Sequence, residues 1–351
     1  MSALFPAGLR PGPGRERRHG EDGDQLARTL RQRLLGSSLL YLSVTLAVLV
    51  VGFSIAAPGS FLTVYNIRTM LTVASVLLVV SVGSTFVIAT AGIDLSVGSV
   101  LVFAGVVSIK AMEAVGGGGA GAVLVGLAAA LLAGLVWGTI NGLLVARLRV
   151  PPLIATLGSM GVALGIAELV TNGSDLNGVP TALFTTIGLG RLFGVVPWIV
   201  VIAAAVTIGA WITLTRTRFG LRTLFIGSNS EASRRSGIDV TRHLITVYAL
   251  AGTLAGLAGF LDLALYASAN IAGHTNDNLQ AVTAVVLGGT SLFGGTASIL
   301  GTVIGVFIPA VLQNGFVIVR VQTFWQEVVI GLVLVFAVYL DQLKRSALER
   351  F

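Results

Sequence analysis

Residues 66–90 read NIRTMLTVASVLLVVSVGSTFVIAT, a stretch in which Arg68 is the single charged residue. A helix needs about 20 predominantly apolar residues to cross the hydrocarbon core of a bilayer. This stretch is longer than that minimum, and it therefore predicts a transmembrane helix.

The same length criterion identifies ten apolar segments along the whole chain. The segments near 97–115 and 279–294 are short or interrupted, so eight full spans with two broken ones is the competing count. We expect an all-α fold, a polytopic transmembrane helical bundle of about ten membrane segments with some interrupted helices. The segments lie near 37–57, 66–90, 97–115, 120–146, 152–171, 195–215, 241–267, 279–294, 296–316 and 324–341.

The composition agrees with a membrane protein. Of the 351 residues, 55% are hydrophobic and 11% are charged, whereas a soluble protein carries about 25% charged residues. The absence of cysteine excludes disulfides, thiolate metal sites and cysteine nucleophiles. The net charge of +7 does not indicate nucleic-acid binding, because the arginines lie at the ends of apolar runs, where membrane topology explains them.

The basic residues also predict how the bundle is oriented. With the N-terminus inside the cell, all of the 22 Lys and Arg residues fall on the cytoplasmic side except Arg68, Lys110, Arg191 and Arg320, as the positive-inside rule expects. Both termini are then cytoplasmic. The predicted organisation is a polar cytoplasmic tail at 1–36, a transmembrane domain at 37–345 with a cytoplasmic loop at 216–242, and a cytoplasmic C-terminus at 346–351.

Several glycines recur at four-residue spacing. This spacing places them on one helix face, which lets two helix backbones approach closely in a bilayer. We therefore expect a compact bundle of closely packed helices. The sets are Gly134, Gly138 and Gly142, then Gly161 and Gly165, Gly252 and Gly256, and Gly301 and Gly305.

The loop at 216–242 contains the start and stop signals of a short helix. Ser228 followed by Glu231 fits a capping box, with Asn229 as the alternative cap. Two arginines suit the last turn, and Gly237 can adopt the left-handed conformation that ends a helix. Because such short helices are marginal in water, we weigh a solvated loop helix against a docking helix for a cytoplasmic partner.

This loop resembles the coupling loop of ribose-type ABC sugar permeases. The stretch AGIDLSVGS at 91–99 is similar to the most recognisable motif of that family. The resemblance spans roughly residues 40–340. The matching stretches, in order, are AGIDLSVGS at 91–99, NG at 141–142, PLIATLG at 152–158, TNG at 171–173, RFG at 218–220, GSNSEASRRSGI at 227–238 and VLGGTSL at 286–292.

The resemblance implies the membrane-spanning permease of a monosaccharide importer in the bacterial cytoplasmic membrane. Such permeases pair as homodimers or with a related permease, receive sugar from an extracytoplasmic binding protein and take energy from a separate ATP-binding subunit. This chain has no phosphate-loop motif, so that partner would use the ATP and Mg²⁺. We expect this chain to hold no cofactor, metal or catalytic residue. Residues expected to contact the ATP-binding subunit are Gly227, Ser228, Asn229, Glu231, Ala232, Arg235, Ser236 and Gly237.

Polar residues at membrane depth are candidates for the translocation pathway, because ionisable groups there usually face a cavity or a partner. A sugar is neutral and rich in hydroxyls, so its pathway needs amides, hydroxyls and an occasional carboxylate. Asp94 could instead cap the turn that follows it, and Asp262 could equally form an interhelical pair. The candidates are Asp94, Ser96, Asn141, Asp262, Asn270, Gln280 and Asn314.

One departure from the family pattern leaves the substrate open. A segment that usually reads Glu-Leu-Asp is Asn278-Leu279-Gln280 here, so neutral amides replace both acids. One alternative is an ABC permease of a sister branch that carries nucleosides or branched-chain amino acids. The other is a secondary transporter driven by protons or sodium through Asp94 or Asp262, which would not explain the helix signals in the 216–242 loop.

Overall fold

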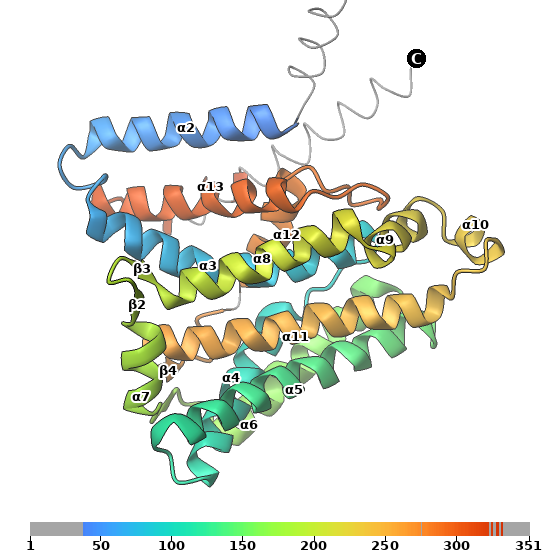
Figure 1. Ribbon diagram of the computed structural model, residues 1–351, viewed down its shortest axis with the longest axis horizontal. Coiled ribbons are helices and arrows are strands. Elements are labelled where there is room, and N and C mark those ends of the chain that lie inside the picture. Colours follow the sequence, from blue (N-terminus) through green and yellow to red (C-terminus); the bar gives the residue numbers. More distant parts are fainter. Residues whose placement is uncertain (1–37, 275, 323, 326–327, 330, 333–351) are drawn as a thin grey trace, which may run out of the picture.

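The computed structural model describes residues 38–274, 276–322, 324–325, 328–329 and 331–332. Eight helices in this part of the chain are long and apolar enough to cross a membrane (Figure 1). The predicted all-α, polytopic bundle is confirmed. The eight are α2 (Ser38–Ala56), α3 (Val64–Ala89), α4 (Val97–Ala114), α5 (Gly119–Ala146), α6 (Pro152–Thr171), α8 (Trp198–Arg216), α11 (Val240–Tyr266) and α13 (Ile299–Ile318).

Some predictions concern residues beyond this description. The tail at 1–36, the C-terminus at 346–351 and most of the predicted span at 324–341 lie outside the described residues. The total number of spans and the sides of the two termini therefore stay predictions.

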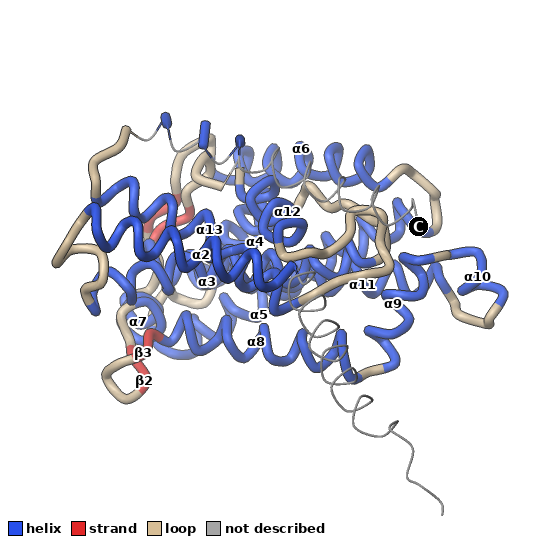
Figure 2. The backbone as a smooth tube through the Cα atoms, turned by 90° about the horizontal axis from the view of Figure 1, so that it is seen from above, coloured by secondary structure: helices blue, strands red, loops and turns tan. Residues whose placement is uncertain are grey.

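Shorter elements connect the spans. Figure 2 shows the strands at one end of the bundle and α10 at the opposite end. β1 pairs antiparallel with β4, and β2 with β3. These elements are β1 (Leu176–Asn177), α7 (Thr181–Leu183), the π-helix η1 (Phe184–Gly188), β2 (Arg191–Leu192), β3 (Val196–Pro197), α9 (Arg218–Ser228), α10 (Ser230–Arg235), β4 (Ser268–Ala269) and α12 (Asp277–Leu287).

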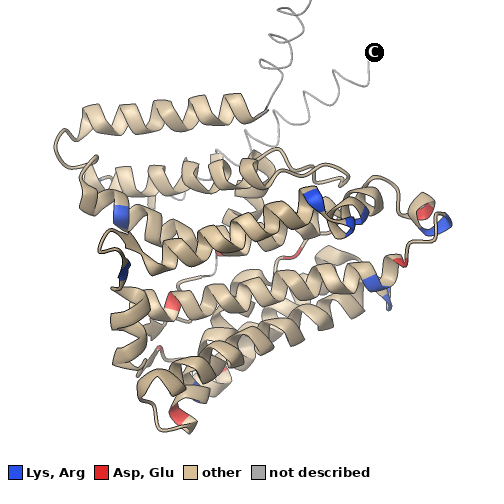
Figure 3. Ribbon diagram, in the orientation of Figure 1, with Lys and Arg blue, Asp and Glu red and all other residues tan. Residues whose placement is uncertain are grey.

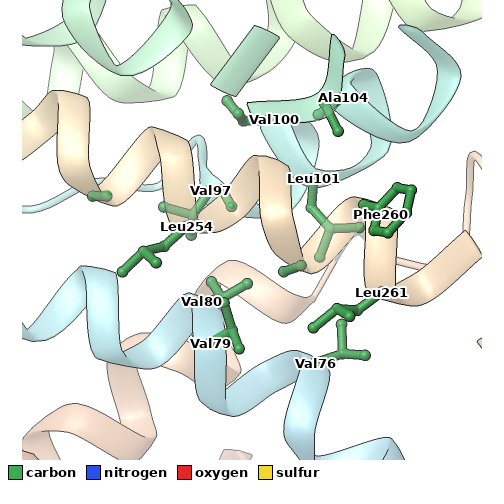
Figure 4. Packing of buried hydrophobic residues seen from close by; sticks show 14 of the residues in the cluster. Val76, Val79, Val80, Val97, Val100, Leu101, Ala104, Leu254, Phe260 and Leu261 are labelled. Atoms are coloured by element: carbon green, nitrogen blue, oxygen red, sulfur yellow. The ribbon is translucent and has the colours of Figure 1, made fainter. Parts of the chain in front are cut away.

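The hydrophobic core lies where α3, α4 and α11 meet. In the most apolar window of α3, 83% of the residues are buried inside the protein, whereas only 6% are buried in that of α2. Figure 4 shows Val79 and Val80 of α3 facing Leu254 and Leu261 of α11, with Leu101 of α4 beside them. The central helices are therefore covered by protein, and the apolar outer face of α2 is left to the lipid.

Glycine packing joins α5 to α11, which make the most extensive helix–helix contact among the described residues. A Cβ atom added at Gly134 would collide with the carbonyl oxygen of Gly252, and one added at Gly138 would collide with that of Tyr248. The expected close approach of helices is thus confirmed for this seam. It is not found for Gly161 and Gly165 on α6, where nothing lies within 4 Å of the position that a Cβ atom would take.

Two helices begin inside the bundle rather than at its ends. α4 begins at Val97, after a non-helical segment at 91–96, and α12 has only 11 residues, too few to cross a bilayer. The two starts touch, because the side-chain amide of Asn278 donates to the carbonyl oxygen of Leu95 at 3.0 Å. The segment at 97–115 is therefore preceded by an interruption, at the turn that Asp94 was expected to cap.

Charged residues are concentrated at one end of the bundle. Figure 3 shows Lys and Arg gathered at the end that carries α9 and α10, with few along the spans. This is the end that the positive-inside rule assigns to the cytoplasm.

Candidate functional site

A cavity of about 450 Å³ lies between α3, α11, α12 and α13. Ligand pockets commonly measure about 300–1,000 Å³, so a monosaccharide fits by size. Polar groups line the cavity from all four sides: Thr69 of α3, Asp262 of α11, Gln280 of α12 and Asn314 of α13. Three of the predicted pathway residues, Asp262, Gln280 and Asn314, are thus brought together here.

An ionic triad forms one wall of this cavity. The imidazole of His274 lies between two carboxylates, with Nε2 at 3.1 Å from Oδ2 of Asp262 and Nδ1 at 2.7 Å from Oδ2 of Asp277. The side chain of His274 is only 12% exposed. Its burial disfavours the charged form, but the hydrogen bonds that it donates to both carboxylates outweigh this and raise the pKa of His274 to about 10. His274 therefore carries a positive charge at neutral pH and donates to both acids.

Sequence analysis did not select His274 or Asp277. A local signal existed, because the two residues are three apart where the chain enters α12. The contact with Asp262 has no such signal, since the chain must reverse direction after α11 to bring His274 back against it. This site depends on the α11–α12 connection more than on any motif.

Asn314 lines the cavity but uses its amide elsewhere. It exchanges two hydrogen bonds with the amide of Asn66, at 2.8 and 2.9 Å, and so links α13 to α3. Asn270 shapes the turn before His274, because its Oδ1 accepts from the backbone N–H groups of Ala272 and Gly273. Asn270 is not among the residues that line this cavity.

A second polar cluster lies apart from the cavity. Asp94 Oδ1 accepts from the backbone N–H of Ser96 at 2.9 Å and from its hydroxyl at 2.6 Å. The amide of Asn141 in turn donates to the Ser96 hydroxyl at 2.8 Å. All three residues are buried, and none lines the cavity. This geometry matches the capping role for Asp94, and a role of these three residues in the pathway stays a prediction.

The extended segment before α4 is also held by α6. The Thr156 hydroxyl accepts from the backbone N–H of Leu95 at 3.2 Å and lies 3.3 Å from the carbonyl oxygen of Ile93. Thr156 belongs to the PLIATLG stretch at 152–158. Two of the sequence motifs, far apart in the chain, thus form one structural unit.

The short helix in the 216–242 loop is present as α10, but its cap is not Ser228. Ser228 is the last residue of α9, and Asn229 Oδ1 accepts from the N–H of Ala232 at 2.8 Å. The capping box is therefore wrong, and the alternative cap is confirmed. Glu231 pairs instead with Arg235 at 3.2 Å, with both side chains mostly exposed.

The end of α10 follows the prediction. Gly237 has a φ of +82°, the left-handed conformation that favours glycine. Its N–H donates to the carbonyl oxygen of Arg234, and that of Ile238 to Ser233, at 3.0 and 3.1 Å. This is the hydrogen-bond pattern of a Schellman motif. Caps at both ends thus define a helix of six residues. Of the predicted coupling residues, Glu231, Ala232 and Arg235 lie within it and Ser236 directly after it.

Three segments that are far apart in the chain meet at a glycine junction. The N–H of Gly295 donates to the carbonyl oxygen of Ala89 at 3.0 Å. A Cβ atom added at Gly227 would collide with that same carbonyl oxygen. Gly227 of α9 therefore touches both the end of α3 and the turn between α12 and α13.

α9 is also joined to α11. The Thr223 hydroxyl lies 2.8 Å from Nε2 of His243, and the ring of Phe219 lies 4.6 Å from the His243 ring. A movement of α9 would therefore reach α11 directly, in addition to the segments at the glycine junction.

Comparisons with known proteins agree with the sequence motifs. A family described as "Branched-chain amino acid transport system / permease component" matches residues 66–338. The ribose import permease protein of Escherichia coli (strain K12) is 40% identical over 307 residues, covering 86% of this chain and 93% of the relative.

Two further relatives have similar coverage. The D-allose transport system permease protein of Escherichia coli (strain K12) is 34% identical over 298 residues, which is 85% of this chain and 90% of the relative. The L-arabinose ABC transporter permease protein of Azospirillum brasilense is 35% identical over 300 residues, which is 85% of this chain and 86% of the relative. No solved structure matches this chain.

Proposed function

We propose, because this chain belongs to the permease-component family of ABC transport systems, that it forms the membrane pathway of a bacterial monosaccharide importer. Its relatives are named for the import of ribose, allose and arabinose, all of them monosaccharides. The chain is a multi-pass protein of the inner membrane. A sister-branch substrate, a nucleoside or a branched-chain amino acid, is the less favoured alternative.

The observation that carries this proposal is the cavity between α3, α11, α12 and α13. Amide, hydroxyl and carboxylate groups converge there in the interior of an otherwise apolar bundle. Such groups suit a ligand covered with hydroxyls, and the about 450 Å³ volume suits one of monosaccharide size. We assign Asp262, Gln280 and Asn314 to the pathway on this basis.

Other parts of the importer are separate subunits in this proposal. An ATP-binding subunit hydrolyses ATP with Mg²⁺, an extracytoplasmic binding protein delivers the sugar, and a second permease, identical or related, completes the pathway. α10 supports a docking role, because it protrudes from the basic end of the bundle and is capped at both ends (Figure 1). Residues 227–237 would form the contact with the ATP-binding subunit.

The glycine junction supports a coupling mechanism. Closure of the ATP-binding subunits would push on α10, and α9 would carry the movement to Ala89 and Gly295 through Gly227. In the chain, Ala89 lies before the start of α4, and Gly295 lies between the end of α12 at Leu287 and the start of α13. The cavity would then open to each side of the membrane in turn. Other transporters alternate access in this way around sites formed by discontinuous helices.

Co-purification with an ATP-binding subunit and a binding protein tests the proposal. We expect ATP hydrolysis by the reconstituted complex to rise with one sugar from a panel of ribose, allose, arabinose and galactose, with a nucleoside and leucine as the sister-branch substrates. The rise should depend on the binding protein. Failure to form a complex with any ATP-binding subunit would instead favour the ion-coupled alternative, for which Asp94 and Asp262 are the residues to test.

A substitution at the junction separates coupling from assembly. Gly227→Ala should abolish the sugar-dependent rise in ATP hydrolysis, because its Cβ atom would displace the Ala89 carbonyl. Gly209→Ala on α8 is the matched control, since nothing lies within 4 Å of that position. Sugar-dependent hydrolysis that survives in a folded Gly227→Ala protein would contradict the coupling route.

A further inference from the structure

The cavity wall contains two carboxylates that each contact His274 through only one of their two oxygens. Asp262 and Asp277 each direct one oxygen, Oδ2, to a ring nitrogen of His274. The Oδ1 atom of each has no hydrogen-bond partner among the described residues, and both residues line the cavity. Each carboxylate therefore has a second oxygen that His274 does not occupy, in a residue that lines the cavity.

His274 fixes the positions of these acceptors. One carboxylate belongs to α11 and the other is the first residue of α12, so no shared helix sets the distance between them. A single imidazole ring bonded to both carboxylates sets that distance. With two acidic side chains against one histidine, the triad is formally net negative.

We propose that Asp262 and Asp277 form a clamp that accepts hydrogen bonds from two hydroxyl groups of the transported sugar, with His274 as their positioning residue. This inference rests on the proposed sugar-import function. Hydrogen bonds to a charged acceptor are about twice as strong as neutral ones. A site built to bind a hydroxyl also discriminates strongly against an analogue that lacks it. The net negative charge would in addition disfavour sugar acids and sugar phosphates.

The first residues of α12 include one acid, Asp277, and two amides, Asn278 and Gln280. Here Asn278 is turned away from the cavity lining and donates to Leu95, which a carboxylate could not do. The acid that faces the cavity is Asp277, and its carboxylate is shared with a histidine.

The clamp is tested with deoxy sugars in the reconstituted importer. For the wild-type protein, we expect removal of a clamped hydroxyl from the transported sugar to lower kcat/KM by about tenfold or more. Asp262→Asn and Asp277→Asn should each reduce this penalty at one hydroxyl position. His274→Ala should reduce it at both. Because every variant works with the same binding protein, the preference of that protein cancels from the comparison with wild type.

Glu113→Gln is the matched control, since it makes the same chemical change in an exposed acid paired with Lys110. This variant should lose as much kcat/KM as the wild-type protein when a hydroxyl is removed from the sugar. If a neutral variant does not fold, Asp262→Glu and Asp277→Glu keep the charge but move the acceptor, and they should change the preference among epimers. Folded variants with unchanged preferences would overturn the clamp alone, whereas a wild-type protein that transports no sugar would overturn the proposed function with it.

Discussion

Two buried polar clusters lie on either side of the place where α4 and α12 begin, and they use their carboxylates in different ways. Asp94 is 3% exposed and accepts two hydrogen bonds from a single neighbour, Ser96. Asp262 is also buried, but its partner is a charged histidine, and it lines a cavity. An acid at membrane depth is therefore not in itself a sign of a pathway; the two acids differ in that Asp262 lines the cavity and Asp94 does not.

Asn278 lies between the two clusters and joins them. Its backbone begins α12 beside Asp277, while its side chain donates to Leu95, next to Asp94. We infer that one cluster holds the interrupted segment in place and the other faces the substrate. The following experiments test this division of roles, beginning with the largest expected effect.

Replacing Asp94 should damage the fold. Asp94→Ala leaves the backbone N–H and the hydroxyl of Ser96 buried without their acceptor, and we expect a loss of about 3 kcal/mol in the free energy of unfolding. Thermal unfolding in detergent measures it, with Glu113→Ala as the exposed control. A stable Asp94→Ala protein that has lost transport would contradict this division of roles, because Asp94 would then belong to the pathway.

Sequence alone predicted the parts of this arrangement that depend on local pattern. The length and hydropathy of 66–90 predicted α3 because a bilayer imposes both. The four-residue spacing of Gly134 and Gly138 predicted a face of close helix packing, although not that α11 would be the partner, and Gly237 predicted the end of α10. Each of these features is decided within a few residues of chain.

What sequence did not predict depends on contacts between distant elements. Asn314 lines the cavity as a predicted pathway residue, but its hydrogen bonds with Asn66, 248 residues away in the chain, had no sequence signal. His274 was not selected, because its partner Asp262 lies on the preceding helix, across a turn whose course no motif specifies. The resemblance to sugar permeases predicted the functional class and not this triad.

The two amides near the start of α12, Asn278 and Gln280, should respond differently to replacement by a carboxylate. Asn278→Asp removes the hydrogen bond to Leu95 and turns a buried carboxylate toward a carbonyl oxygen, so we expect a loss of about 2 kcal/mol. Gln280→Glu is the same change in a residue that lines the cavity, and the fold should tolerate it. Equal unfolding temperatures for the two variants would contradict the separation of structural and cavity-facing positions.

His274 should make stability depend on pH. Its pKa in the folded protein, about 10, is above the ordinary value of 6.5. The stabilisation is therefore complete below pH 6.5, declines as the pH rises, and is lost once the pH passes about 10. The difference in unfolding temperature between wild type and His274→Gln, measured at pH 6, 8 and 10, should shrink in that order. A difference that does not change with pH would show that the imidazole is neutral.

The exposed pair of Glu231 and Arg235 provides the baseline for both clusters. This pair of opposite charges lies in water, with the side chains of Glu231 and Arg235 63% and 79% exposed. Such exposed pairs contribute about 0.5 kcal/mol or less to the free energy of unfolding. Glu231→Gln should therefore leave the unfolding temperature almost unchanged. Because α10 keeps its Asn229 cap in this variant, a loss of sugar-dependent ATP hydrolysis would report a lost contact with the ATP-binding subunit, and unchanged hydrolysis would remove Glu231 from that contact.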